Sequence, residues 1–385
     1  MDEQTRERGM PEDDRHQIFK NRNKLIQQHC SDHFSTNSSL LGSNTIYVDP
    51  VHRIYYCPIQ KVASTFWKII ILLLSGYDSS ASPFNMTLRD DQRKTQTVSP
   101  ESLSNALQSG GEAFFFVRDP YARLFSCYED KLYYANPIFW KTIGSDIVST
   151  IRGNSEAGRS RYGYDVTFSE FIKYVLYKHQ SKARLDVHFR PMHKFCNPCQ
   201  TQYNYIGHLE TFAEDATYIL SKWRQQFDDV TIKIDDIHHQ TGLRVAVNKL
   251  HNLFEMKKLL PDKTFPFIKL LLRAWRSLQI RGYLSKDIKF PFHGDVSDIT
   301  SEDVAKVMTQ ALNTPQNITA VKLQRAEALL QAYRQVPLED MELLRKFVLT
   351  DCLLFGYDDR PASLFNKLKP TGDEFLYLDG ISDKV

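Results

Sequence analysis

Short apolar runs alternate with amphipathic stretches along the first half of the chain. Two runs, Arg53–Cys57 and Ala113–Val117, have the length and the aromatic and β-branched content of buried strands. Each is followed within a few residues by a helix-like stretch, Lys61–Ile70 after the first and Tyr121–Tyr128 after the second. A third strand is predicted at Tyr203–Gly207. Strands that alternate with helices predict an α/β fold with a mostly parallel sheet.

The flanking patterns are more polar or more helical. Residues 1–44 are polar and predicted to be partly disordered, with residues 1–15 disordered and a modest helix over residues 16–30. Residues 228–300 are poorly patterned, apart from an apolar stretch at Phe265–Trp275 that suits either a buried helix or a membrane-surface or partner helix. A helical C-terminal part is predicted from helices at 301–312, 321–334 and 339–354.

Composition limits the classes of function. The 385 residues with 42% apolar content are ample for a packed core, and the net charge of only +3 gives no bulk basic field for nucleic acid. No apolar run is long enough to cross a bilayer, and the charged N-terminus does not resemble a signal peptide. We therefore expect a cytosolic protein, or membrane attachment only through an anchor that is not present in this chain.

The six cysteines leave several interpretations open. Cys196-Asn-Pro-Cys199, with His188 and His193 upstream, has tolerable spacing for a zinc site, and a redox motif or disulfide bonds are the alternatives. The cysteines are too sparse for a disulfide scaffold but compatible with a few bridges in an oxidising lumen. Three glycosylation acceptor triplets begin at Asn37, Asn85 and Asn317.

Lys61-Val-Ala-Ser-Thr65 stands where the first strand turns into a helix. Such a turn points free backbone N–H groups, and the positive end of the helix dipole, at an anion. The segment contains no glycine, so it is not a Walker A loop, and we expect it to wrap a single phosphate. Lys61 supplies a cation, and Ser64 and Thr65 supply hydroxyls at the helix start. The alternative is a capped amphipathic helix with no ligand.

Arg118 stands at the matching position after the second strand. Asp119-Pro120 then begins a helix with proline in its first turn, and Ser126 follows about two turns into that helix. An arginine at a strand end typically meets a carboxylate or a phosphate, so a structural Arg–Asp pair is the alternative to anion binding. We expect Arg123 to be solvated or paired with an acid. Two such sites in one sheet suit a ligand with phosphates at two ends.

These segments resemble the Golgi carbohydrate sulfotransferases. Lys61–Trp67 is similar to their loop for the 5′-phosphosulfate, and Phe116–Ser126 is similar to their segment for the 3′-phosphate. Further stretches resemble the subfamily that sulfates chondroitin, dermatan and related glycans: Asp186–Pro191, Phe195–Cys199, Tyr203–Gly207, Glu210–Ala216 and Asp351–Tyr357. The chain departs from the family at Gln60, where a proline often stands, and residues 228–325 are less familiar.

The resemblance implies a sulfotransferase-like, P-loop-like fold in one catalytic domain over residues 45–357, followed by a C-terminal tail over 358–385. It implies 3′-phosphoadenosine 5′-phosphosulfate as donor substrate, no metal, a glycan acceptor of chondroitin/dermatan or N-glycan type, and a place in the Golgi lumen or membrane. It favours disulfides for the cysteines, with no pairing assigned. The residues that would hold the 5′-phosphate are Lys61, Val62, Ala63, Ser64 and Thr65.

The remaining roles implied by the resemblance concern the 3′-phosphate and the proton. Arg118 and Ser126 would hold the 3′-phosphate, and Lys61 would stabilise the charge that builds on the leaving oxygen. His188 is the candidate general base, with Glu129 and Asp130 as weaker candidates and a structural histidine as the alternative. Two other functions stay open, a non-catalytic glycan-binding protein of the same fold and a P-loop-like nucleotide kinase that would need Mg²⁺.

Overall fold

The computed structural model describes residues 12–33, 45–76, 82–84, 96–153, 163–234, 236–258, 265–367 and 374–379. The predicted polar segment is described only over residues 12–33, and its residues 1–11 and 34–44 lie outside the described residues. The glycosylation acceptors Asn37 and Asn85 also lie outside them. The chain divides into two compact units. The first comprises Met1–Arg123, Asp186–Asp235 and Val348–Asp359, and the second comprises Leu124–Leu185, Asp236–Phe347 and Arg360–Val385. The predicted domain boundaries at residues 45 and 357 stay a prediction.

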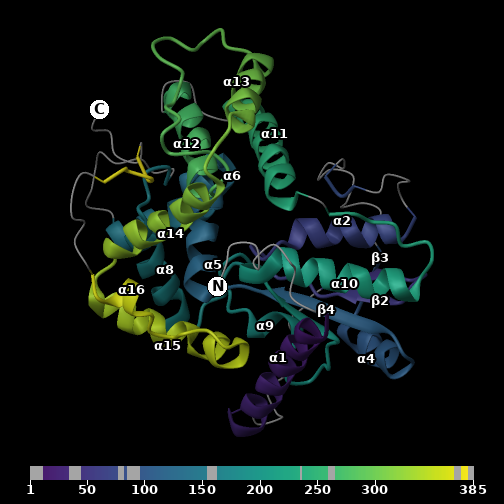
Figure 1. The fold of residues 1–385 in the computed structure, drawn as a ribbon. Helices are drawn as coiled ribbons and strands as arrows, with labels where there is room; N and C mark the ends of the chain where they lie inside the picture. Colours follow the sequence, from purple (N-terminus) through teal and green to yellow (C-terminus); the bar gives the residue numbers. More distant parts are fainter. Residues whose placement is uncertain are drawn as a thin grey trace, which may run out of the picture. The chain divides into compact units, whose positions relative to one another are not determined.

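The first unit is built on a five-stranded sheet of order β3-β1-β2-β4-β5. Three of its strands, β2, β3 and β4, are labelled in Figure 1. Its strands are β1 (Ile46–Asp49), β2 (Ile54–Tyr56), β3 (Gln96–Val98), β4 (Glu112–Val117) and β5 (Tyr205–His208). The pairs β2–β4 and β4–β5 are parallel, whereas β1 is antiparallel to both β2 and β3. The predicted α/β class is confirmed, but the sheet is mixed, because a tight hairpin joins β1 directly to β2 and a hairpin can only join antiparallel strands.

Three consecutive phenylalanines of β4 fill both faces of this sheet, because neighbouring side chains of a strand point to opposite sides. Phe114 and Phe116 pack against Trp67 of α2 (Ser64–Leu74), with ring centroids 4.7 and 5.0 Å apart. Phe115 packs on the opposite face against Tyr203, at 4.6 Å. Trp67 is fully buried, so this side chain belongs to the core of the first unit.

Helix α1 (Glu12–His33) covers β5, which would otherwise be an exposed sheet edge. Arg15 and Arg22 both form ion pairs with the buried Asp215, at 2.9 and 2.7 Å. The prediction of a helix here is confirmed, but residues 12–15 belong to it and are not disordered. The remaining helices in the described part of this unit are α4 (Pro100–Gln108), α9 (His193–Cys196), η5 (Leu209–Thr211) and α10 (Phe212–Gln226).

The second unit is helical throughout its described part. The three predicted C-terminal helices are confirmed as α13 (Ser301–Asn313), α14 (Ile318–Arg334) and α15 (Leu338–Phe355), the last of which continues into the first unit. The poorly patterned region contains two helices, α11 (Ile237–Lys257), which the sequence did not reveal, and α12 (Phe267–Ile280). The other described elements are α5 (Pro120–Tyr128), which begins in the first unit, η2 (Glu129–Tyr133), α6 (Pro137–Phe139), η3 (Trp140–Gly144), α7 (Ser145–Ile147), η4 (Val148–Arg152), α8 (Phe168–Gln180) and α16 (Ala362–Phe365).

The apolar stretch at Phe265–Trp275 supplies most of helix α12. Its side chains Leu270, Leu271 and Trp275 are at most 1% exposed, so the interpretation as a buried helix is confirmed. Among the described helices, none combines the length and the apolar character that a bilayer crossing requires.

Candidate functional site

The loop between β2 and α2 has an unusual backbone. Lys61 and Ala63 have φ angles of 68° and 53°, whereas the residues on either side of each do not have positive φ. When successive residues alternate between right-handed and left-handed backbone conformations, their N–H groups point toward one place. This makes a concave binding site for an anion. Non-glycine residues rarely adopt positive φ, and such residues concentrate where a loop clamps a ligand. The loop therefore has a backbone of the kind that can bind an anion, although it contains no glycine, and its binding of a phosphate stays a prediction.

The start of helix α2 offers further donors to the same loop. Ala63 is the N-cap, and no side chain caps the helix there. The first N–H groups of a helix have no acceptor within the helix. Ser64 and Thr65 occupy the first helical positions, while the side chain of Val62 is fully buried, so Val62 can contribute only its backbone. The helix start therefore has no side-chain cap, and the choice between an anion site and a helix start without a ligand stays open.

Arg118 lies beside the Lys61 loop because β2 and β4 are neighbouring parallel strands, paired as Tyr56 with Phe114. Arg118 is 4% exposed, and its guanidinium donates from Nη1 to the Lys61 carbonyl oxygen at 3.4 Å. Asp119 caps the following helix by accepting from the Ala122 N–H at 2.7 Å. The structure thus brings together the two segments that the sequence singled out, at the same edge of the sheet.

Arg123 corrects the sequence analysis, which expected a solvated or acid-paired side chain. It is only 3% exposed, and its guanidinium donates to three backbone carbonyls. These are the carbonyls of Gln60 at 2.9 Å, Arg190 at 2.7 Å and Val187 at 3.4 Å. Arg123 therefore joins the loop before Lys61 to the segment that carries His188. The pattern of apolar and polar residues gives no sign of these contacts, because the acceptors are backbone atoms of segments that are distant in the sequence.

His188 forms a dyad with Asp186 in that segment. Asp186 Oδ1 accepts from the His188 backbone N–H at 2.9 Å and lies 2.7 Å from Nδ1, and the His188 side chain is 19% exposed. A carboxylate on Nδ1 orients an imidazole and makes Nε2 the nitrogen that takes up a proton. The alternative base candidates, Glu129 and Asp130, lie in an ion cluster of the second unit.

Within that cluster Glu129 is almost fully buried, and it bonds to Arg281 at 2.9 Å, Lys249 at 3.5 Å and the Ser277 hydroxyl. Burial would raise the pKa of Glu129, but the charges of Arg281 and Lys249 outweigh burial and hold that pKa below its ordinary value. A carboxylate with a lowered pKa is a weaker proton acceptor, which favours His188 over Glu129 as the base.

The C-terminal stretch Asp351–Tyr357 is hydrogen-bonded to the segment that follows His188, although it lies far from that segment in the sequence. The buried Asp351 carboxylate accepts from the Met192 N–H at 2.7 Å, and from the His193 N–H and Nδ1 at 2.9 and 2.7 Å. Burial would raise the pKa of Asp351, yet the hydrogen bonds from His193 and Met192 hold this pKa below its usual range. The sequence marked this stretch as similar to the family but did not reveal its contacts.

The same stretch reaches the segment after Arg118. The Tyr357 hydroxyl donates to Glu210 Oε2 at 2.8 Å, and Glu210 Oε1 accepts from the Asp119 N–H at 2.9 Å. Glu210 follows β5, so the carboxyl ends of β4 and β5 are tied together through it. Ser126 lies on α5 in the second unit, and its predicted contact with a 3′-phosphate stays a prediction.

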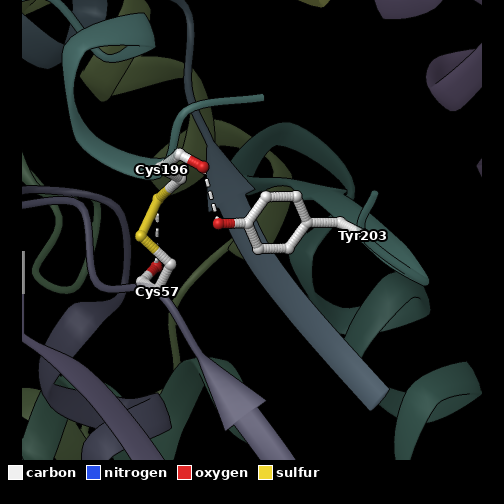
Figure 2. Close-up of a disulfide and its surroundings, with 3 residues drawn as sticks. All are labelled: Cys57, Cys196 and Tyr203. Carbon is white, nitrogen blue, oxygen red and sulfur yellow. Dashed lines mark hydrogen bonds between the residues drawn. A yellow bond between two sulfur atoms is a disulfide. The ribbon is translucent and has the colours of Figure 1, made fainter. Parts of the chain in front are cut away.

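Two disulfides resolve the cysteine alternatives. Cys57 bonds Cys196, and Cys30 bonds Cys199. Figure 2 shows the first bridge with Tyr203, whose hydroxyl donates to the Cys196 carbonyl at 2.6 Å. The zinc and redox interpretations of Cys196-Asn-Pro-Cys199 are wrong, because each cysteine is bonded to a partner outside the motif. Within the described ranges, no cluster of three or more potential metal-ligating side chains is present.

Comparisons with known proteins agree with this geometry. The sequence profile of the sulfotransferase family matches residues 44–239. Carbohydrate sulfotransferase 8 of Homo sapiens is 25% identical over 260 residues, which cover 66% of this chain and 61% of that protein. Carbohydrate sulfotransferase 9 of Homo sapiens is 33% identical over 180 residues, 46% of this chain and 40% of that protein.

A third relative is carbohydrate sulfotransferase 11 of Rattus norvegicus, which is 31% identical over 182 residues, 46% of this chain and 51% of that protein. The match therefore spans less than two thirds of the length of each of these relatives. No solved structure matches the chain. The region matched by the family profile contains the Lys61 loop, Arg118, Arg123 and His188.

Proposed function

The chain belongs to the sulfotransferase family, and we propose that it transfers a sulfuryl group from 3′-phosphoadenosine 5′-phosphosulfate to a glycan hydroxyl. The supporting observation is that the Lys61 loop and Arg118 are neighbours, joined by the bond from the Arg118 guanidinium to the Lys61 carbonyl. A donor with phosphate groups at both ends of one adenosine needs two neighbouring anion sites. The sulfated end would lie in the alternating backbone of the loop.

The residues at this edge suit an in-line displacement. Charge builds on the phosphate oxygen that leaves the sulfur, and a fixed cation aimed at that oxygen lowers the barrier. We assign this role to Lys61, and the binding of the 5′-phosphate to Ser64, Thr65 and the backbone of Val62 and Ala63. Arg118 and Ser126 would hold the 3′-phosphate.

His188 would take the proton from the attacking hydroxyl, since a sugar hydroxyl is a poor nucleophile by itself. Asp186 would hold the imidazole in the required orientation. Every step of this scheme uses the donor, the acceptor and side chains of the chain itself. Residues 45–357 would form the catalytic domain, with a P-loop-like arrangement of strand, loop and helix around Lys61.

The acceptor and the compartment follow from the relatives and the disulfides. The names of the relatives concern carbohydrate, which supports a glycan acceptor. From the resemblance of the sequence motifs we propose that this glycan is of chondroitin/dermatan or N-glycan type, on a proteoglycan or glycoprotein. Two disulfides favour an oxidising compartment such as the Golgi lumen, because cytosolic thiols are kept reduced.

The test is transfer of radiolabelled sulfate from the donor to a panel of desulfated glycans, with and without Mg²⁺. We expect labelling of at least one glycan without metal, and loss of that labelling in Lys61→Ala with only modest loss of donor binding. Absence of labelling on every glycan, with intact binding of 3′-phosphoadenosine 5′-phosphate, would favour the non-catalytic glycan-binding alternative. Thermal stabilisation that needs both ATP and Mg²⁺ would favour the kinase alternative.

A further inference from the structure

We propose that Arg123 is a positioning residue that holds the Lys61 loop and the His188 segment at a fixed spacing. The inference rests on the proposed function, because it assigns to Arg123 the alignment of the donor with the general base. Arg123 would contact neither substrate, and it would act through the two segments whose carbonyls it binds. We call this arrangement, Arg123 with the carbonyls of Gln60, Val187 and Arg190, the carbonyl clamp.

The carbonyl clamp connects residues that lie one or two positions from the two candidate groups. Nε of Arg123 binds the Gln60 carbonyl, one residue before Lys61. Nη1 and Nη2 bind the carbonyls of Arg190 and Val187, on either side of His188. The guanidinium is planar and rigid, so a shift of either segment would break at least one of these bonds. The spacing of the two segments is therefore set by the width of one side chain.

The surroundings of the guanidinium make these bonds strong and specific. Arg123 is 3% exposed, and the Phe195 ring lies 5.7 Å from its guanidinium carbon. A buried cation needs compensation, and carbonyl oxygens and an aromatic face both supply it. A lysine at this position would present one ammonium, which cannot reproduce a planar fork with donors on three sides.

A covalent link joins the same two segments independently. Cys57 lies shortly before Gln60, and Cys196 lies shortly after Arg190. The disulfide therefore restrains the outer ends of both segments, while Arg123 restrains the parts next to Lys61 and His188. A reacting pair of groups must be held to well under an ångström for efficient catalysis, which a single outer link does not ensure.

The first experiment follows amide hydrogen exchange and needs no activity. In Arg123→Lys we expect the amides of residues 58–66 and 186–196 to exchange together about tenfold faster, because bonds from a charged donor are lost on both sides. The control is Arg224→Lys, since Arg224 is an exposed arginine of the same unit that donates to one carbonyl, Ile232, at 3.0 Å. Unchanged exchange, or a change in only one of the two segments, would overturn the proposal.

The second experiment is a double-mutant cycle in the sulfate-transfer assay. In the wild-type background, Arg123→Lys should lower kcat about 10- to 100-fold. In the His188→Ala background the same change should lower kcat less than about threefold, because aligning the donor with the base has no effect once the base is absent. An equal loss in both backgrounds would show general destabilisation and contradict a positioning role. A wild-type chain without transfer activity would refute the proposed function alone, since the exchange experiment still decides whether the carbonyl clamp exists.

Discussion

Replacing Asp351 with asparagine tests whether the C-terminal stretch holds the His188 segment. The two carboxylate oxygens share three donors: Oδ2 accepts from the Met192 N–H, and Oδ1 accepts from the His193 N–H and Nδ1. An asparagine has one acceptor oxygen, so its NH₂ group would face an N–H donor on one side. Because Asp351 is 3% exposed, water cannot easily replace the missing acceptor.

The expected loss follows from these contacts. One bond to a charged acceptor contributes about 1.5–3 kcal/mol, and the donor left unsatisfied in the interior costs about 1–3 kcal/mol more. We expect Asp351→Asn to lower the free energy of unfolding by about 3–5 kcal/mol at pH 7. The control is Asp228→Asn, which removes the same charge from an exposed position in the same unit and should change stability by less than about 0.5 kcal/mol.

The pH dependence gives an independent check. Since the pKa of Asp351 is lower in the folded than in the unfolded chain, its contribution is fully present above the unfolded pKa of about 3.9 and is lost as pH falls through the folded pKa. Urea denaturation with intact disulfides should therefore show a gap between wild type and Asp351→Asn that narrows below about pH 4. A gap under about 1 kcal/mol at pH 7, or one that does not change with pH, would refute the reasoning.

Three further predictions concern the site itself. Arg118→Ala should weaken binding of 3′-phosphoadenosine 5′-phosphate about 10- to 100-fold by calorimetry, since a charged bond to phosphate is lost, and retained affinity would remove Arg118 from the phosphate site. His188→Ala should slow single-turnover sulfate transfer about 10²- to 10⁴-fold with donor affinity unchanged, and a change under about threefold would return His188 to a structural role. Replacing Cys57 and Cys196 with serine should lower the free energy of unfolding by about 4 kcal/mol in urea denaturation, because the Cys57–Cys196 bridge closes a loop of about 30 residues while Cys30–Cys199 is intact. An unchanged urea midpoint would contradict this estimate from loop entropy.

Much of the local structure was readable from the chain. The two strand–turn–helix segments around Lys61 and Arg118, and the three C-terminal helices, lie where the apolar periods predicted them. These features depend on residues two to four positions apart, so a sequence pattern records them directly. That the Lys61 and Arg118 motifs lie next to each other also follows from the sequence, once the strands before them are known to be parallel and adjacent.

The tertiary structure alone decided the contacts that hold this site together. The pairing of Cys57 with Cys196, the three carbonyls around Arg123 and the bonds from Asp351 to Met192 and His193 all join segments that are distant in the sequence. The partners in these contacts are backbone atoms or single side chains, so they produce no periodic pattern and no characteristic spacing in the sequence. A local pattern specifies which face of an element is apolar, whereas the partner of a buried cation or carboxylate depends on how the whole chain closes around it.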